Sequence, residues 1–424
     1  MSTRVIEVRI WGQLVGAVAP DPNLGAYVFE YDPAWRRSGV ELSPLKMPTG
    51  AARPLFVFPG LAESFMKLPG LLADALPDDF GNGLIDAWMA GHGVAKSSIT
   101  ALDRLAYMGR RGMGALEFRP ARGSATESQR PLEMQALVEA ARNVLRGDLA
   151  GDTHAQAALA NIIRVGTSAG GARAKAVIAW NPRTLEIRSG QFEVDEGFEH
   201  WLLKFDGVGR DLELGTTADY GRIEYAYHLM ATQAGVDMAP CRLLEENGRA
   251  HFMTRRFDRE GNRKHHIQSL CALAHLDYRQ RATHAYEQLF MALVELGLGD
   301  PALVQAFRRM ALNVMARNCD DHTKNFAFRL RQGERWELAP AYDFTHAHNP
   351  RGEWTYQHLL GVNGRFDDIR REDLLAVGDR FGVPGAKAIL AETSAALGRW
   401  GEFARQAGVP PEKEREIAAD FRRI

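Results

Sequence analysis

The sequence contains few cysteines and no long hydrophobic run. Cys241, Cys271 and Cys319 are scattered through 424 residues and show no metal-binding spacing. Such a low, odd number is typical of a reducing cytoplasm and argues against a disulfide-rich scaffold. No stretch of about 18 apolar residues occurs, and the N-terminus lacks the apolar segment of a signal peptide. We therefore expect a cytoplasmic protein with no membrane partner.

An excess of charge of one sign is also absent. Lys and Arg number 52 and Asp and Glu number 53, which gives a formal net charge of -1. Because no global basic field attracts nucleic acid, a role at DNA requires a local patch or a basic partner. The composition, with 46% hydrophobic and 25% charged residues, is ordinary for a globular protein. The length allows two or three domains or one two-lobed enzyme.

The N-terminal part of the chain is predicted to be rich in β-structure. Alternating apolar residues predict strands at 5–10, 14–19 and 26–31. Helical spacing predicts helices over 60–76 and 84–90. A segment rich in Gly, Ser and Arg, 119–130, is predicted to be a linker.

A glycine-rich loop follows two predicted helices, 133–149 and 154–164, and precedes a predicted strand, 176–180. Small residues let backbone N–H groups approach phosphate oxygens, although a flexible connector has the same composition. The loop contains Ser168, Ala169, Gly170, Gly171 and, at its end, Lys175.

One lysine, Lys204, lies within a predicted apolar strand, 201–205. Burying a lysine costs free energy unless an anion is near. The next predicted helix, 220–234, carries Glu224 near its start. In protein kinases a strand lysine binds nucleotide phosphates and pairs with a helix glutamate. The alternative is that Lys204 extends from an edge strand into solvent.

A hairpin follows this helix. Asn-Gly at 247–248 predicts a tight turn between strands 240–245 and 249–256. The second strand leads into Phe257 and toward the C-terminal half. A strand in this place can offer backbone groups to an adenine.

Asp320 and Asn325 lie in a polar stretch, 318–326, that follows a predicted helix, 301–317. Their spacing, Asp-x-x-x-x-Asn, is that of the catalytic-loop Asp and the metal-binding Asn of protein kinases. Asp343 follows a short predicted hairpin, where kinases place the acid that binds the phosphate-bridging metal. A charged surface turn is the alternative interpretation of this stretch.

Other side chains near this stretch suggest different chemistry. His322, His346 and His348 raise the possibility of a zinc site, but no cysteine or carboxylate pattern accompanies them. Cys319 is expected to be a buried filler and not a nucleophile. Asp321 is expected to be a bystander beside Asp320.

Helical patterns dominate the remaining C-terminal half, with strands expected on either side of a hairpin after the polar stretch. Helices are predicted at 267–274, 284–296, 371–381, 385–407 and 411–423, and strands at 327–330 and 336–339. We name the strand 249–256 the hinge strand. Phosphotransfer requires a particular order of elements, and the sequence has it: glycine loop, strand lysine, helix glutamate, hinge strand, Asp-x-x-x-x-Asn loop and final Asp.

With these elements in this order, the chain resembles the HipA family, the kinase toxins of bacterial type II toxin–antitoxin systems. The resemblance implies an α+β, two-lobed, protein-kinase-like fold with a β-rich N-terminal subdomain and a mostly helical C-terminal lobe. It divides the chain into 1–120, the N-terminal subdomain; 121–258, the rest of the N-lobe; and 259–424, the C-lobe. The matching stretches are 72–82, 168–175, 203–205, 254–259, 320–325 and 342–343.

The resemblance also implies roles for single residues, with ATP and Mg²⁺ as cofactors. Asp320 matches the catalytic Asp, which accepts the proton of the substrate hydroxyl. Asn325 and Asp343 match the magnesium ligands, and Lys204 matches the phosphate-binding lysine with Glu224 in support.

Further ATP-binding residues follow from the same resemblance. Arg255 and Phe257 match the hinge pair whose backbone meets adenine, although the family often has Glu at position 255. His322 and Lys324 are interpreted as orienting the loop and neutralising the transferred phosphate. In the glycine loop, Lys175 is retained, whereas Arg173 departs from the family pattern.

Ser168 falls on the serine that relatives autophosphorylate, which moves the loop out of the ATP site. Thr167 is an alternative site of modification. The resemblance implies a Ser/Thr protein kinase that inhibits growth and is held inactive by a small helix-turn-helix, HipB-like antitoxin, which binds operator DNA. Its implied substrate is a translation component such as an aminoacyl-tRNA synthetase.

Three alternatives remain open at this level. They are a kinase of the same fold without a toxin role, a catalytically weak corepressor that binds its antitoxin, and a metal hydrolase. The full set of Lys204, Asp320, Asn325 and Asp343 argues against the corepressor.

Overall fold

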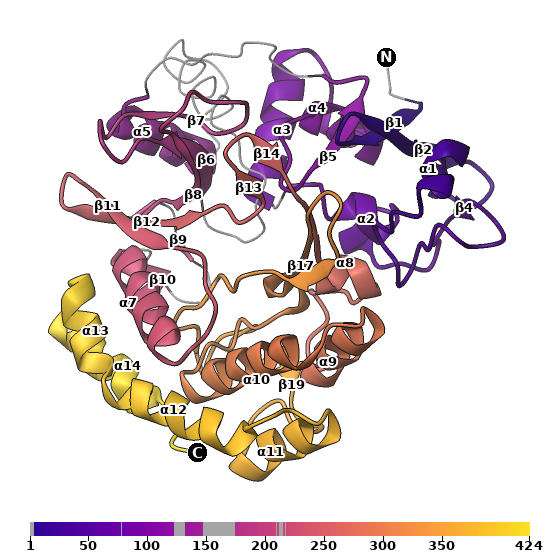
Figure 1. Ribbon diagram of the computed structural model, residues 1–424. Coiled ribbons are helices and arrows are strands. Elements are labelled where there is room, and N and C mark those ends of the chain that lie inside the picture. The colour runs from indigo at the N-terminus through magenta and orange to yellow at the C-terminus, as the bar shows by residue number, and fades with distance from the viewer. Residues whose placement is uncertain are drawn as a thin grey trace.

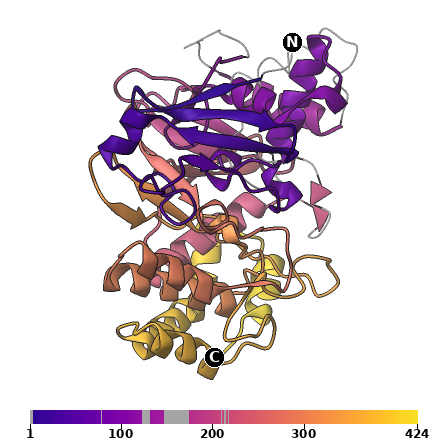
Figure 2. The same cartoon turned by 90° about the vertical axis from the view of Figure 1, so that its right-hand side faces the viewer.

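The computed structural model describes residues 4–77, 79–122, 132–146, 174–208, 210–211, 215–216 and 218–424. Two five-stranded sheets form the upper part of the molecule and a group of helices forms the lower part (Figures 1 and 2). The predicted helix 154–164 and residues 165–173 of the glycine loop lie outside the described residues, as do residues 123–130 of the predicted linker.

The N-terminal sheet has the strand order β4-β3-β2-β1-β5 and is antiparallel throughout. Apolar residues of each strand alternate toward a buried core that helices α2, α3 and α4 also contact. Thr100 and Asp103 form a capping box that begins α4. The elements are β1 (Ile6–Ile10), β2 (Gln13–Asp21), β3 (Ala26–Tyr31), α1 (Pro33–Ser38), β4 (Leu55–Phe56), η1 (Glu63–Phe65), α2 (Gly70–Ala73), α3 (Asp79–Gly91), η2 (Lys96–Ser98), α4 (Ala101–Met108) and β5 (Leu116–Arg119).

The single helix predicted over 60–76 is wrong. Two short helical turns, η1 and α2, occupy this segment. Met66 and Lys67 have positive φ angles of 50° and 61°, and Pro69 lacks the N–H that a continuing helix needs. The apolar residues are buried as expected, but they are buried by turns.

The second sheet has the order β11-β12-β8-β6-β7 and is also antiparallel. Helix α7 packs against β12 and carries Glu224. The strands predicted around Lys204 and the 247–248 turn are confirmed to within two residues at nearly every end. The elements are α5 (Met134–Arg146), β6 (Lys175–Trp180), β7 (Ile187–Ser189), β8 (Glu199–Lys204), β9 (Arg210–Asp211), β10 (Gly215–Thr216), α7 (Tyr220–Gln233), β11 (Cys241–Glu246) and β12 (Arg249–Arg255).

Helices and a small β15-β17-β18 sheet form the C-terminal part. The predicted helix 267–274 is half wrong, because β15 occupies its first residues and pairs with β17, and the Ser269 side chain then caps α8. The elements are β13 (Arg259–Glu260), β14 (Arg263–Lys264), β15 (His266–Ser269), α8 (Leu270–Ala274), β16 (His284–Ala285), α9 (Tyr286–Glu295), α10 (Asp300–Met315), η3 (Thr323–Asn325), β17 (Ala327–Leu330), β18 (Trp336–Leu338), β19 (Leu360–Gly361), α11 (Arg371–Arg380), α12 (Ala386–Gly398), α13 (Trp400–Ala407) and α14 (Pro411–Asp420).

Hydrogen bonds join the N-terminal sheet and its helices to the C-terminal part. The Asp74 carboxylate accepts from the Ser269 backbone N–H at 2.6 Å and from its hydroxyl at 2.7 Å. The indole N–H of Trp336 donates to the Glu41 carbonyl at 2.9 Å. Within the described ranges, no helix has the length and apolar character needed to span a membrane.

Candidate active site

A pocket lies where the second sheet, α7 and the C-terminal part meet. Its lining combines the strand lysine, the hinge strand and the loop that follows α10. The lining residues include Lys204, Glu224, Thr254, Arg255, Phe257, His322, Lys324, Asn325, Tyr342 and Asp343. Segments separated by more than 100 residues in the sequence therefore share one cavity.

Lys204 lies between two carboxylates at the inner end of this pocket. Its Nζ donates to Glu224 Oε1 at 2.6 Å and also to Asp343 Oδ1. Burial alone would lower the pKa of Lys204, but the charges of Asp343 and Glu224 outweigh it and raise that pKa. Burial likewise opposes ionisation of Asp343, yet Lys204 and Lys175 hold its pKa well below the usual range. The solvent-exposed alternative for Lys204 is wrong.

Lys175 is the cross-strand neighbour of Lys204. The two residues are directly opposite each other in the β6–β8 pair, so their side chains leave the same face of the sheet. Lys175 is only 2% exposed. Two like charges placed opposite each other destabilise a sheet unless an anion compensates them. Asp343 supplies one such charge, and the arrangement suits additional phosphate oxygens.

The stretch 318–326 leaves α10 through Arg317, which has a positive φ of 56°. Asn325 donates its side-chain Nδ2 to the Asp320 carbonyl at 2.7 Å. This bond commits the nitrogen of the amide and leaves Oδ1 to meet a cation. The Asp320 side chain is exposed. The spacing of the two residues thus closes a loop that turns one carboxylate outward.

Asp343 has a strained backbone, with a φ of 61°. Asn318 Nδ2 donates to its carbonyl at 3.3 Å, and Tyr342 donates its hydroxyl to the Lys324 carbonyl at 2.6 Å. Both bonds join the loop that bears Asp320 to the loop that bears Asp343, so the two loops are fixed relative to each other.

Asp321 is not a bystander in the structure. It is fully buried, and its carboxylate accepts from the Tyr286 hydroxyl, from His358 Nδ1 and from the backbone N–H groups of Leu359 and Leu360, at 2.8 to 3.4 Å. Burial opposes charging of His358, but Asp321 outweighs it and raises the pKa of His358 to about 10. Asp321 therefore fixes the stretch 318–326 to the segment 358–360.

Cys319 is buried, as predicted, and its Sγ lies 3.8 Å from His358 Nε2. Of the three histidines in the zinc alternative, His322, His346 and His348, the last two contact a carboxylate elsewhere in the chain. His346 Nε2 and His348 Nδ1 contact the Asp420 carboxylate at 2.8 and 2.7 Å. In the part of the chain that the structure describes, no group of three metal-ligating side chains forms.

The hinge strand presents an unusual carbonyl. Arg255 N–H donates to the Pro240 carbonyl at 2.9 Å, across the β11–β12 ladder. Such a pair normally exchanges two hydrogen bonds, but proline has no N–H to return. The Arg255 carbonyl is therefore free of that ladder bond at the pocket lining. The Arg255 side chain is 48% exposed and lies 3.5 Å from Glu199, so it belongs to the rim.

Phe257 continues the hinge and contacts the opposite loop. Its ring stacks with Tyr342 at 5.7 Å between centroids, and its carbonyl accepts from Arg329 Nη1 at 2.7 Å. Lys324 lies 4.6 Å from the ring centroid of Tyr278, and His322 packs edge-on against the same ring. His322 and Lys324 both line the pocket.

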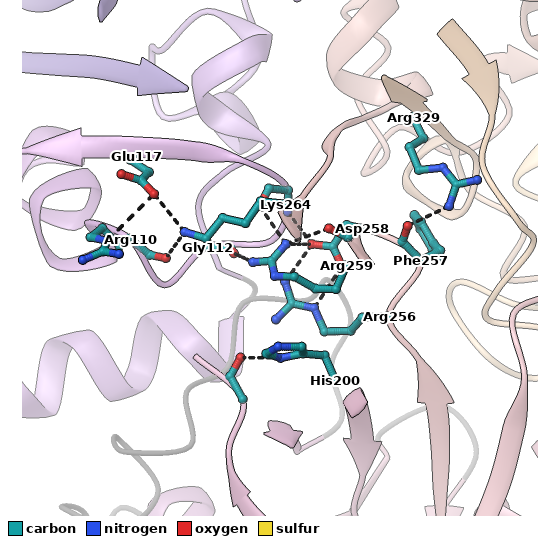
Figure 3. A network of polar contacts seen from close by, with 12 residues as sticks. Arg110, Gly112, Glu117, His200, Arg256, Phe257, Asp258, Arg259, Lys264 and Arg329 are labelled. Carbon is teal, nitrogen blue, oxygen red and sulfur yellow. Dashed lines mark hydrogen bonds and ion pairs between the residues drawn. The ribbon is translucent and has the colours of Figure 1, made fainter. Parts of the chain in front are cut away.

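Directly after Phe257, the buried carboxylate of Asp258 binds two arginines (Figure 3). Asp258 accepts from Arg256 Nε and Nη2 at 2.9 and 2.7 Å and from Arg259 Nη1 at 2.7 Å. It also accepts from the Gly114 backbone N–H at 2.7 Å. Burial opposes its charge, but the arginines lower its pKa well below the usual range.

No role was predicted from the sequence for Asp258, Tyr342 or Arg329, and Asp321 was predicted to be a bystander. The Arg-Phe-Asp-Arg run at 256–259 was a usable signal for Asp258, because an acid between arginines predicts an ion pair. Ser168, Ala169, Gly170, Gly171 and Thr167 lie outside the described residues, so the structure places none of them.

The residues that line the pocket fit a magnesium nucleotide. The Asp343 carboxylate and the Asn325 amide oxygen are the hard donors that Mg²⁺ prefers. Lys204 suits phosphate oxygens, and the Arg255 carbonyl suits the amino edge of a base. Lys175 is buried opposite Lys204 in the β6–β8 pair, so it adds positive charge beside these lining residues.

Comparison with known proteins agrees with this architecture. Residues 6–119 match the HipA N-terminal domain, and residues 167–422 match the HipA-like C-terminal domain. No curated protein sequence matches the chain.

Among solved structures, a chain of the Shewanella oneidensis MR-1 complex of HipA, HipB and operator DNA superposes with a TM-score of 0.68 at 18% identity, covering 98% of this chain and 94% of that one. The Helicobacter pylori proinflammatory kinase CtkA gives a TM-score of 0.34 at 12% identity, covering 53% of this chain and 88% of that one. The predicted HipA-like α+β fold is confirmed by the first of these. Because the C-terminal match alone spans more than half of the sequence, the chain belongs to the HipA family.

Proposed function

We propose that this protein is an ATP- and Mg²⁺-dependent serine/threonine protein kinase that acts as the toxin of a toxin–antitoxin system. The observation that carries the proposal is the position of Lys204 between Glu224 and Asp343, in the same pocket as Asn325. Strand lysine, helix glutamate and loop acid meet there as phosphotransfer requires.

In this proposal each residue has a separate task. Lys204 and Lys175 bind phosphate oxygens, and Glu224 holds Lys204 in place. Asn325 Oδ1 and Asp343 hold the Mg²⁺, which neutralises charge on the phosphoryl group when bound. Asp320, exposed at the mouth of the loop, accepts the proton of the substrate hydroxyl. The Arg255 carbonyl accepts from the adenine amino group.

The biological role rests on the family. The Shewanella oneidensis HipA was solved with HipB and operator DNA, which supports a HipB-like helix-turn-helix antitoxin here and DNA contact mainly through it. A net charge of -1 agrees with leaving DNA binding to the partner. The proposed substrate is a translation component such as an aminoacyl-tRNA synthetase, and autophosphorylation at Ser168 is proposed to silence the kinase.

The test uses purified protein with Mg²⁺ and radiolabelled ATP. We expect the wild type to label itself at Ser168 and to arrest growth when expressed. Asp320→Ala should lower labelling by at least about a hundredfold, since general-base help contributes two to four decades. A folded wild type that binds ATP but neither labels a protein nor arrests growth would instead be a corepressor module. Labelling without growth arrest would indicate a kinase without a toxin role.

A further inference from the structure

Two segments of the N-terminal subdomain reach the nucleotide pocket. Leu71 lies in α2 and Leu76 follows it, whereas Met113 lies in the loop before β5 and Leu116 begins that strand. They line the same cavity as the hinge residues, but they lie more than 130 residues before them in the sequence. These four side chains are apolar, and Asp74 of the first segment also lines the pocket.

Asp258 fixes the second of these segments to the hinge. Its carboxylate accepts the Gly114 N–H at 2.7 Å, and Arg259 Nη2 donates to the Gly112 carbonyl at 3.3 Å. Met113 lies between these two contacts. Figure 3 shows Arg259 between Gly112 and Asp258. The backbone on both sides of Met113 is thus bonded to the two residues that follow the hinge.

A second set of contacts fixes the same loop from the other side. A Cβ placed on Gly114 would lie only 3.1 Å from Ile267 Cγ1, so the loop packs closely on β15. Ile267 also lines the pocket, and it pairs with Arg329, which donates to the Phe257 carbonyl. Gly114, Ile267, Arg329 and Phe257 therefore form a continuous path around the outer edge of the hinge.

The first segment has its own fixed position. Asp74, between Leu71 and Leu76, accepts two hydrogen bonds from Ser269 at the end of β15. Gly70 N–H donates to His275 Nε2 at 3.1 Å, in a contact where any side chain on Gly70 would overlap the Ala272 carbonyl. Both segments are consequently held in place by hydrogen bonds to residues that follow the hinge strand.

We propose that the N-terminal subdomain forms the outer wall of the nucleotide pocket and that Met113 is a specificity-determining residue for substituents on the base. The inference rests on the proposed function, because it needs a nucleotide at the hinge. Met113 and Arg255 line the same pocket, so a group added to the amino nitrogen of an adenine held by the Arg255 carbonyl would enter the cavity that Met113 bounds. Met113 is half-buried, so its side chain can be shortened without opening the core.

The test compares binding of ATP and N6-benzyl-ATP, each with Mg²⁺, by titration calorimetry of the full chain. We expect the wild type to prefer ATP by at least about tenfold, the size of effect that a poorly fitting group produces in a packed pocket. Met113→Ala should reduce this preference to less than about threefold while leaving ATP affinity within about threefold.

Two further variants separate specificity from loss of structure. Met291→Ala makes the same substitution at a 50% exposed position on α9 and should keep the wild-type preference. Met113→Leu retains an apolar side chain of similar volume and should also keep it. Thermal unfolding of each variant shows whether the chain is folded.

The outcomes distinguish the two proposals. Failure of the wild type to bind ATP would overturn the kinase and, with it, the wall. Binding of ATP with equal affinity for the benzyl analogue, or an unchanged preference in folded Met113→Ala, would overturn the wall alone. A loss of preference in both Met113→Ala and Met291→Ala would also overturn it.

Discussion

At the scale of single residues, the site depends on charges that are buried together. Lys204 is 12% exposed in its side chain and Glu224 is 3% exposed. Each would be costly to bury alone, and each is compensated by the other and by Asp343. The sequence predicted this pairing because a lysine in an apolar strand requires an anion. It did not predict the role of Asp321, whose four partners come from residues 286 and 358–360.

The first stability prediction concerns this pair. Lys204→Met should lower the free energy of unfolding by about 3–5 kcal/mol, because Glu224 would remain buried without its cation. Adding Glu224→Gln should recover part of that loss, since it removes the uncompensated charge. Urea unfolding measures both values.

Lys413→Met serves as the matched control. Lys413 pairs with Glu416 at 2.7 Å, but both side chains are about half exposed. Loss of that pair should cost less than about 1 kcal/mol. Equal effects of Lys204→Met and Lys413→Met would show that the Lys204 pair carries no special stability.

At the scale of elements, local pattern was sufficient where it agreed with the tertiary structure. The ends of strands β3 and β17 and of helix α10 were predicted nearly to the residue. In each of them, either the apolar pattern extends over many residues or turn-forming residues mark the ends. Over 60–76 the periodicity was helical, but Pro69 and the left-handed residues Met66 and Lys67 divide the segment. At 267–274 the pairing of β15 with β17 overrode a helical pattern, as tertiary contacts commonly do.

The contact between the stretch 318–326 and the segment 358–360 should make stability depend on pH. The folded pKa of His358 is raised to about 10 from an ordinary value of 6.5. A raised folded pKa gives stability that is complete below the ordinary value and is lost as pH rises through the folded value. The groups that face His358 are the Asp321 carboxylate and the Cys319 thiol.

We therefore expect the stability advantage of the wild type over His358→Gln to be largest below pH 6.5 and to shrink between pH 6.5 and about 10. The slope should be at most about 1.4 kcal/mol per pH unit, which is the value for one proton. Urea unfolding at several pH values measures it. An advantage that grows over this range would contradict the assigned ion pair.

At the scale of the whole molecule, bonds between distant parts of the chain decide the shape of the pocket. Gly114 and Asp258 are 144 residues apart, and Ser269 is 195 residues from Asp74. No local pattern specifies such pairs, because each of these polar groups could equally well form its hydrogen bonds with water. The sequence could therefore predict residues that meet in the pocket, such as Lys204, Asn325 and Asp343, but it could not predict that the N-terminal subdomain reaches them.

The last prediction tests this connection. Asp258→Asn should destabilise the protein by about 3–5 kcal/mol, because Arg256 and Arg259 would be left buried without their anion. It should also increase cleavage of the loop 109–115 by a protease, since Gly114 would lose a charged acceptor. Denaturant unfolding and limited proteolysis measure these effects.

Asp195→Asn is the control for that variant. Asp195 pairs with Arg188 at 2.6 Å, but it is 61% exposed, so its loss should cost under about 1 kcal/mol and leave the loop protected. A stable, protease-resistant Asp258→Asn variant would mean that contacts other than those of the Asp258 carboxylate hold the subdomain to the hinge.

Pro240 has a consequence for how this protein could change. A residue with an N–H at position 240 would supply the ladder bond that the Arg255 carbonyl lacks, and it would strengthen the junction of β11 and β12. Under the proposed function, the same donor would then compete with the base of the nucleotide for that carbonyl. Stability and nucleotide recognition would make opposite demands at this position, so a search for more stable variants would tend to select against nucleotide affinity.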